Sequence, residues 1–105
     1  MPDILTELAE VIHARKSASP DKSYVASLLQ KGPDGILKKI GEEAAEVLLA
    51  GKEGNQKAVT HEVADLWFHT LILLASLDLG PEDVLEELRA RHGVSGHMEK
   101  AARKG

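Results

Sequence analysis

Apolar residues recur at helical spacing from the start of the chain. Residues 3–16 carry one such stripe, which predicts a first helix. It is expected to end before a short polar loop at 17–20, because Pro20 disfavours helix in the residue before it. Ser23 is a good N-cap for a second, shorter helix that stops at Gly32.

Two longer helices are predicted in the middle of the chain. The third begins at Pro33, a residue suited to a first helical turn, and is expected to end at Gly51. The breaker-rich segment G-K-E-G-N then precedes a fourth helix from about Gln56 to Leu79. Because residues 66–77 are apolar almost all round, this fourth helix should be the central and most buried element.

The C-terminal third predicts one more full helix. Residues 81–92 have acids in the first turn and arginines in the last, as the helix dipole favours, and Gly93 should end the helix. A short helix capped by Ser95 is expected near the end of the chain. Aromatic residues make up only 3% of the sequence, so the core must be aliphatic. We therefore expect an all-α bundle of four to five helices in a single domain, residues 1–105.

Composition narrows the functional classes. The formal net charge of −4 argues against a general nucleic-acid binder, and the absence of cysteine excludes disulfides and thiolate metal sites. The longest apolar run, 71–77, is too short to cross a bilayer, and no N-terminal targeting pattern is visible. A cytoplasmic location is the expectation. The sequence has a basic stretch at 89–104 and an acidic centre. This combination suits an anionic ligand that binds together with a cation.

Two pairs of acids stand out at i, i+3 spacing: Glu43 with Glu46, and Glu62 with Asp65. Residues three apart share one face of a helix. If the third and fourth helices form an antiparallel hairpin centred near Gly54, Glu43 lies level with Asp65, and Glu46 with Glu62. Four facing carboxylates repel one another unless a cation lies among them, and hard oxygen ligands favour Mg²⁺ or Mn²⁺.

The acid pairs, His69 and Trp67 can each also be explained by a structural role without any part in catalysis. Acid pairs at helical spacing are usually solvated faces, although these four border the apolar stripes. His69 is expected to be a hydrogen-bonded core histidine rather than a metal ligand. Trp67 is expected in the core or at a dimer interface.

Four segments together resemble the phosphoribosyl-ATP pyrophosphatases of histidine biosynthesis. They are S-Y-V-A-S-L-L-Q-K-G (23–32), K-K-I-G-E-E-A-A-E (38–46), E-V-A-D-L-W-F-H (62–69) and S-G-H-M-E-K-A-A-R (95–103). E-E-x-x-E followed by E-x-x-D is the shared mark of the all-α nucleotide pyrophosphatases, which include MazG-like enzymes and dimeric dUTPases. The first and last segments make the narrower assignment. One departure is Phe68, where a tyrosine is expected.

The resemblance implies a MazG-like helical bundle, completed by dimerisation, with active sites at or near the interface of a homodimer. It implies Mg²⁺-dependent cleavage of phosphoribosyl-ATP to phosphoribosyl-AMP and pyrophosphate. The metal ligands then fall on Glu43, Glu46, Glu62 and Asp65, and Glu42 or Glu46 is the candidate general base. Candidates for holding the substrate phosphates are Lys31, Lys38, Lys39, Lys100 and Arg103.

Two other functions remain open at this point. The chain could be a MazG-like housekeeping hydrolase of nucleoside triphosphates, which the S-G-x-x-E-K tail argues against. It could also be a non-catalytic helical module that dimerises through residues 66–77. That second possibility predicts no dependence of any property on Mg²⁺.

Overall fold

The structure is a computed structural model that describes residues 3–92. Over that range all the regular secondary structure is helical, including one short 3-10 turn, and there is no strand, which confirms the all-α expectation. The elements are α1 (Ile4–Ala14), η1 (Arg15–Ser17), α2 (Tyr24–Gln30), α3 (Pro33–Glu53), α4 (Gln56–Ser76) and α5 (Pro81–His92). The short helix expected after Ser95 lies outside the described residues, as do Lys100 and Arg103.

Three helices begin at a side-chain cap. The Asp3 carboxylate accepts a hydrogen bond from the Thr6 backbone N–H at 2.9 Å and starts α1. Ser23, the predicted cap of α2, accepts from the Ala26 N–H at 3.2 Å. Asn55 starts α4 in the same way. These bonds satisfy N–H groups that a helix leaves without partners in its first turn.

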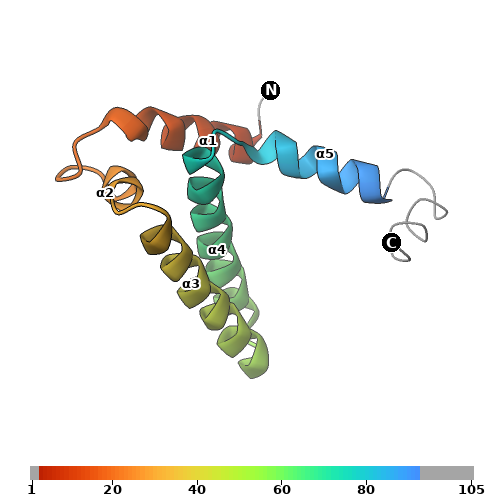
Figure 1. The fold of residues 1–105 in the computed structure, drawn as a ribbon. Coiled ribbons are helices and arrows are strands. Elements are labelled where there is room, and N and C mark those ends of the chain that lie inside the picture. The colour runs from red at the N-terminus through yellow and green to blue at the C-terminus, as the bar shows by residue number, and fades with distance from the viewer. Residues whose placement is uncertain (1–2, 93–105) are drawn as a thin grey trace.

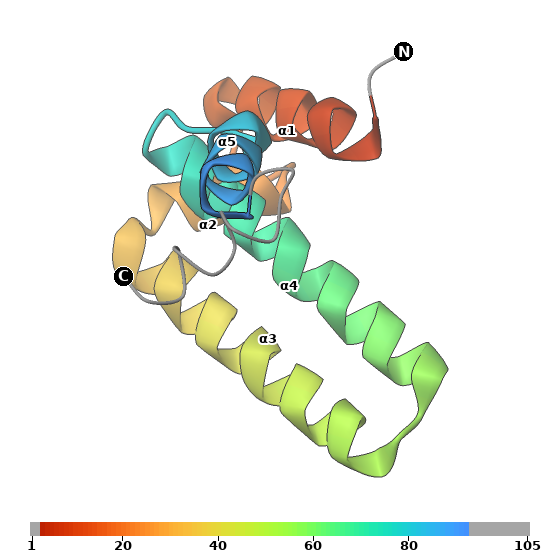
Figure 2. The same cartoon turned by 90° about the vertical axis from the view of Figure 1, so that its right-hand side faces the viewer.

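The helices α3 and α4 form the predicted antiparallel hairpin and lie side by side along most of their length (Figures 1 and 2). The expected end at Gly51 is wrong, because α3 continues to Glu53. Gly54 ends it instead, with φ 74°, and its N–H bonds to the Ala50 carbonyl at 3.1 Å. A glycine is tolerated inside a helix at a cost of about 1 kcal/mol, whereas this left-handed conformation strongly favours glycine.

The end of α4 also differs from the prediction. The helix stops at Ser76 rather than Leu79, because the Leu79 N–H turns back to the Leu74 carbonyl at 2.8 Å. Asp78 takes a positive φ of 60° there, and its carboxylate lies 3.0 Å from the Lys16 ammonium after α1. The chain then enters α5 at a bend of 103°.

The core lies where α1, α2 and α3 meet the second half of α4. Ile12, Ile36 and Ile72 are its fully buried residues, so it is aliphatic, as the composition predicts. The helix α4 is central in that it contacts α1, α2 and α3. Its burial is incomplete, however, because Trp67 is 55% exposed and is therefore not a core residue in this chain.

The molecule is elongated, measuring 50 × 34 × 30 Å, because the α3–α4 hairpin projects away from α1 and α5 (Figure 1). Its Cα radius of gyration is 16.0 Å, against about 13 Å for a compact chain of this length. Leu48 and Leu49 on α3 are 74% and 62% exposed. The hairpin thus leaves apolar surface uncovered.

Over residues 3–92, no single helix is long and apolar enough to cross a membrane. Only α4 and α5 taken together reach that length and composition, and the bend between them interrupts the pair.

Candidate functional site

The first half of α4 carries a compact group of ligand-type side chains. One ligand atom from each of His61, Glu62 and Asp65 lies within 4.8 Å of the others. The His61 Nε2 is 3.4 Å from an Asp65 carboxylate oxygen. Both acids are predicted from the sequence, whereas His61 is not, although its i, i+4 spacing from Asp65 is the signal that identifies it.

The acids of α3 differ sharply in their surroundings. Glu43 is only 8% exposed, and one of its carboxylate oxygens lies 3.5 Å from the Lys39 ammonium. Glu42 is more exposed and lies 3.8 Å from the same ammonium. Glu46, closer to the Gly54 turn, is exposed. The group of three ligand atoms found among residues 3–92 includes neither Glu43 nor Glu46.

A hydrogen-bonded pair of rings connects α2 to α4 beside these acids. The Tyr24 hydroxyl lies 2.8 Å from His69 Nε2, and the rings meet edge to face at 84°. His69 Nδ1 lies 2.7 Å from the Asp65 backbone carbonyl oxygen. His69 is 5% exposed, so the expectation of a buried, hydrogen-bonded histidine is confirmed.

Acids from both arms of the hairpin affect the pKa of Tyr24. Partial burial raises the pKa of Tyr24 above its ordinary value, while the positive charge of Lys39 opposes the rise. The negative charges of Glu43, Glu42 and Asp65 then raise that pKa further. The described residues therefore place both Glu43 and Asp65 within electrostatic range of Tyr24. They show no shared partner for Glu46 and Glu62.

The predicted phosphate-binding lysines are distributed unevenly. Lys39 lies among the acids, and its pKa is raised first by Tyr24 and then by Glu43 and Glu42. Lys31 and Lys38 are exposed. Of the predicted cations within residues 3–92, Lys39 is the one that forms ion pairs with the acids.

The donor set is chemically suited to a divalent cation. Glu62 and Asp65 offer carboxylate oxygens close enough to share one ion, and oxygen ligands are what Mg²⁺ and Mn²⁺ prefer. Glu43 adds a nearly buried carboxylate whose positive neighbour is the Lys39 ammonium. A buried carboxylate needs such a partner, and a metal ion meets the same need. The imidazole of His61 is less typical of Mg²⁺ sites and suits softer metals.

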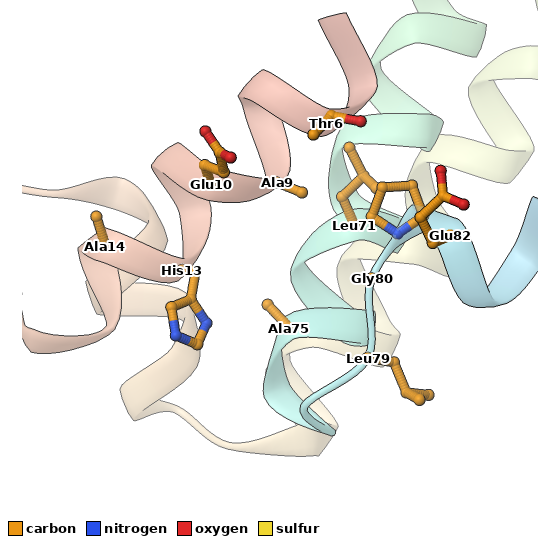
Figure 3. A pocket seen from close by; sticks show the side chains of 11 residues that line it. Thr6, Ala9, Glu10, His13, Ala14, Leu71, Ala75, Leu79, Gly80 and Glu82 are labelled. Atoms are coloured by element: carbon orange, nitrogen blue, oxygen red, sulfur yellow. The ribbon is translucent and has the colours of Figure 1, made fainter. Parts of the chain in front are cut away.

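A separate cavity lies away from these acids. It has a volume of about 380 Å³ and is bounded by α1, the second half of α4 and the start of α5. Figure 3 shows Ala9 and Ala75 projecting into it from α1 and α4, with His13 and Glu10 nearby. None of the predicted site residues lines it. An open hollow of about 430 Å³, by contrast, borders His61 and Glu62.

Comparison with known proteins gives a consistent set of similarities. The family profile described as phosphoribosyl-ATP pyrophosphohydrolase matches residues 5–92. A phosphoribosyl-ATP pyrophosphatase of Nitrosospira multiformis is 63% identical over 103 residues, covering 98% of this chain and 85% of the relative. Proteins of the same name from Methylococcus capsulatus and Geobacter sulfurreducens are each 57% identical. These two matches cover 97% and 96% of this chain, and 97% and 94% of the relatives.

Proposed function

Because this chain belongs to the phosphoribosyl-ATP pyrophosphohydrolase family, we propose that it hydrolyses phosphoribosyl-ATP to phosphoribosyl-AMP and pyrophosphate in histidine biosynthesis. The structural observation that carries the proposal is the group of ligand-type side chains on α4, in which Glu62 and Asp65 offer carboxylate oxygens close enough to share one cation. Cleavage of a phosphoanhydride needs charge compensation, a positioned water and a proton acceptor. The hairpin carries carboxylates and the Lys39 ammonium, which are groups suited to these requirements.

We propose Mg²⁺ as the cofactor, with Mn²⁺ able to substitute, held by Glu43, Glu46, Glu62 and Asp65. When bound, such an ion neutralises phosphate charge and lowers the pKa of a coordinated water. Support comes from the short separation of the Glu62 and Asp65 ligand atoms and from the buried Glu43 carboxylate. Glu46 is the ligand with least structural support, because it is exposed and lies outside the group on α4.

The remaining catalytic and binding roles are assigned to residues from their exposure and charge. Lys39 is a cation already located at the acids, where it can meet a phosphate oxygen. Glu42 and Glu46 are exposed carboxylates and can accept a proton from water. Lys31 and Lys38 are also exposed. We propose that they contact the outer phosphates, together with Lys100 and Arg103. Burial keeps Glu43 out of the solvent and suits it to binding rather than to proton exchange.

We also propose that the protein is a cytoplasmic homodimer. The elongated hairpin exposes leucines on α3, and Trp67 on α4 is more than half exposed. Covering such surface with a second copy would remove apolar area from water at roughly 25 cal/mol per Å². The acids lie on the same hairpin, so dimerisation through it would place the site at or near the subunit interface.

Pyrophosphate release from phosphoribosyl-ATP tests the activity, with a panel of nucleoside triphosphates assayed beside it. We expect Mg²⁺-dependent release from phosphoribosyl-ATP, loss of release in EDTA, and loss in Glu46→Ala and Asp65→Ala. Glu82→Ala, which removes an exposed acid on α5, is the matched control and should retain activity.

Four results would contradict parts of this proposal. Preference for an ordinary triphosphate would indicate a housekeeping hydrolase instead. Release that is unaffected by EDTA would contradict the cofactor. Near-normal turnover by Glu46→Ala would remove that residue from the site, and a monomer by light scattering at working concentration would contradict the dimer.

A further inference from the structure

The group of ligand-type side chains on α4 includes a histidine that Mg²⁺ does not need. His61 lies one residue before Glu62 and four before Asp65, and one ligand atom from each of the three lies within 4.8 Å of the other two. All three residues belong to one helix, and the group includes neither Glu43 nor Glu46 of α3. The structure therefore contains a donor set of one nitrogen and two oxygens that does not depend on α3.

The separation of two of these atoms fits a tetrahedral ion. His61 Nε2 lies 3.4 Å from Asp65 Oδ2, which is beyond the usual range of a hydrogen bond. Ligand atoms about 2.1 Å from a tetrahedral Zn²⁺ lie about 3.4 Å apart, whereas at an octahedral Mg²⁺ neighbouring ligands lie about 3.0 Å apart. The i, i+4 spacing is also that at which two histidines hold Zn²⁺ in the helical motif H-E-x-x-H, and here Asp65 stands in place of the second histidine.

The exposure of these residues allows an ion to reach them. The His61 side chain is 73% exposed and that of Asp65 is 42% exposed. The open hollow of about 430 Å³ borders His61 and Glu62. Three protein ligands with solvent on the remaining side form the arrangement in which Zn²⁺ keeps a water molecule or another small ligand in its fourth position.

We propose that His61, Glu62 and Asp65 form an inhibitory site for Zn²⁺. An imidazole nitrogen favours Zn²⁺ and similar transition-metal ions over Mg²⁺, which prefers oxygen ligands. The inhibition rests on the proposed function, because Glu62 and Asp65 are there ligands of Mg²⁺. An ion held at His61 occupies both of these carboxylates, so Zn²⁺ and Mg²⁺ exclude each other. His61 thus influences which metal the hairpin binds and takes no part in hydrolysis.

Metal binding measured without substrate tests the site directly. Zn²⁺ affinity, determined by competition with a chromogenic chelator, should fall by at least about tenfold in His61→Ala, because loss of even an outer-shell partner costs that much. Mn²⁺ affinity, determined by electron paramagnetic resonance, should stay within about twofold. The matched control is His13→Ala, which removes an exposed histidine of α1 that belongs to no group of three ligand atoms within residues 3–92. Equal Zn²⁺ affinity in His61→Ala and the wild type would overturn the inference.

Displacement measures whether the two ions share their carboxylates. An equimolar addition of Zn²⁺ to the Mn²⁺-loaded protein should return Mn²⁺ to solution and restore its sharp resonance spectrum. The same addition to His61→Ala should displace much less Mn²⁺. Asp65→Asn should weaken the binding of both ions, whereas Glu43→Gln should weaken that of Mn²⁺ alone, because Glu43 is not part of the group on α4. Zn²⁺ that binds while Mn²⁺ stays bound would overturn the inference.

Spectroscopy identifies the ligand atom and the geometry. Co²⁺ bound to three protein ligands and one water should show the strong visible absorption of a four-coordinate ion, and His61→Ala should lose this absorption. In the Zn²⁺-loaded protein, nitrogen NMR should show the metal on His61 Nε2, the nitrogen that lies 3.4 Å from Asp65. The weak absorption of six-coordinate Co²⁺, or a metal on Nδ1, would overturn the inference.

Pyrophosphate release separates this inference from the proposed function. Free Zn²⁺, set with a metal buffer, should inhibit Mg²⁺-supported release by the wild type and by His13→Ala, and added Mg²⁺ should relieve the inhibition. The Zn²⁺ concentration that halves the rate should rise by at least about tenfold in His61→Ala. Equal sensitivity to Zn²⁺ in His61→Ala would overturn the inference and leave the proposed function standing. Wild-type protein that binds Zn²⁺ and exchanges it for Mn²⁺ as expected but releases no pyrophosphate would overturn the proposed function alone.

Discussion

Replacing Glu43 with Gln separates the contribution of this residue to catalysis from its contribution to folding. The substitution keeps the size of the side chain and removes one negative charge that is nearly buried and 3.5 Å from Lys39. If Glu43 binds the cation, turnover should fall by about 10²–10³-fold, the usual effect of removing a preorganised charge from an active site. The free energy of unfolding should change little.

The small effect on stability follows from the ion pair. Lys39 is about one-third exposed, and an i, i+4 pair at a surface is worth about 0.3–0.5 kcal/mol. A change of 1 kcal/mol shifts the melting temperature of a domain of this size by about 4–8 °C. The expected shift for Glu43→Gln is therefore no more than about 4 °C. Removing the buried charge also removes a desolvation cost, which acts in the opposite direction.

Pyrophosphate release and thermal unfolding followed by circular dichroism, on the same preparations, measure the two quantities. Glu53→Gln is the matched control, because it changes an exposed acid at the end of the same helix. Turnover within about threefold of the wild type would refute the ligand role of Glu43. A melting temperature lowered by more than about 8 °C would show that the carboxylate is structural, and that its loss affects activity through the fold.

Three further substitutions test other parts of the structure. His61→Ala should weaken Zn²⁺ binding, measured by calorimetry, and leave Mg²⁺-supported turnover within about threefold, because imidazole favours softer metals. Ser23→Ala removes the bond to the Ala26 N–H and should lower the free energy of unfolding in urea by about 1 kcal/mol; no change would mean that the cap is dispensable. The hydrogen bond from Lys16 lowers the pKa of Asp78, so its stabilisation is present above the ordinary value of about 3.9 and is lost as the pH falls below it. The stability difference between wild type and Asp78→Asn should therefore be visible at neutral pH and vanish in acid, and a difference that survives in acid would contradict this origin.

The sequence predicted the helices well where a start signal was local. Ser23 caps α2 and Pro33 opens α3 as expected, because each acts through its own backbone or its nearest neighbours. Helix ends were less predictable, since two glycines compete to end α3. Gly51 lies within the helix, and Gly54 ends it because the Asn55 cap of α4 follows at once. Which of the two glycines ends α3 therefore depends on α3 and α4 together.

The candidate site was predictable to the extent that it depends on spacing. The pairing of Glu43 with Asp65 follows from hairpin arithmetic, and α3 and α4 do pack against each other as that arithmetic requires, but the pairing itself stays a prediction. The contact of Tyr24 with His69 spans 45 residues and depends on how α2 packs against α4, which no local pattern encodes. The burial of Trp67 was overestimated for a related reason. An apolar residue indicates a surface that needs covering, but not whether the same chain covers it.

The two-residue connection between α3 and α4 has a consequence for how this protein can vary. Surface turns usually accept insertions, and this one is exposed. Here, one additional residue that continued α4 backwards would rotate every later side chain by about 100° and advance it by about 1.5 Å relative to α3. The carboxylates of α4 would then face away from those of α3, although the stability of each helix would hardly change. The length of a solvent-exposed bend is thus constrained by the proposed site, which lies several helical turns away from it.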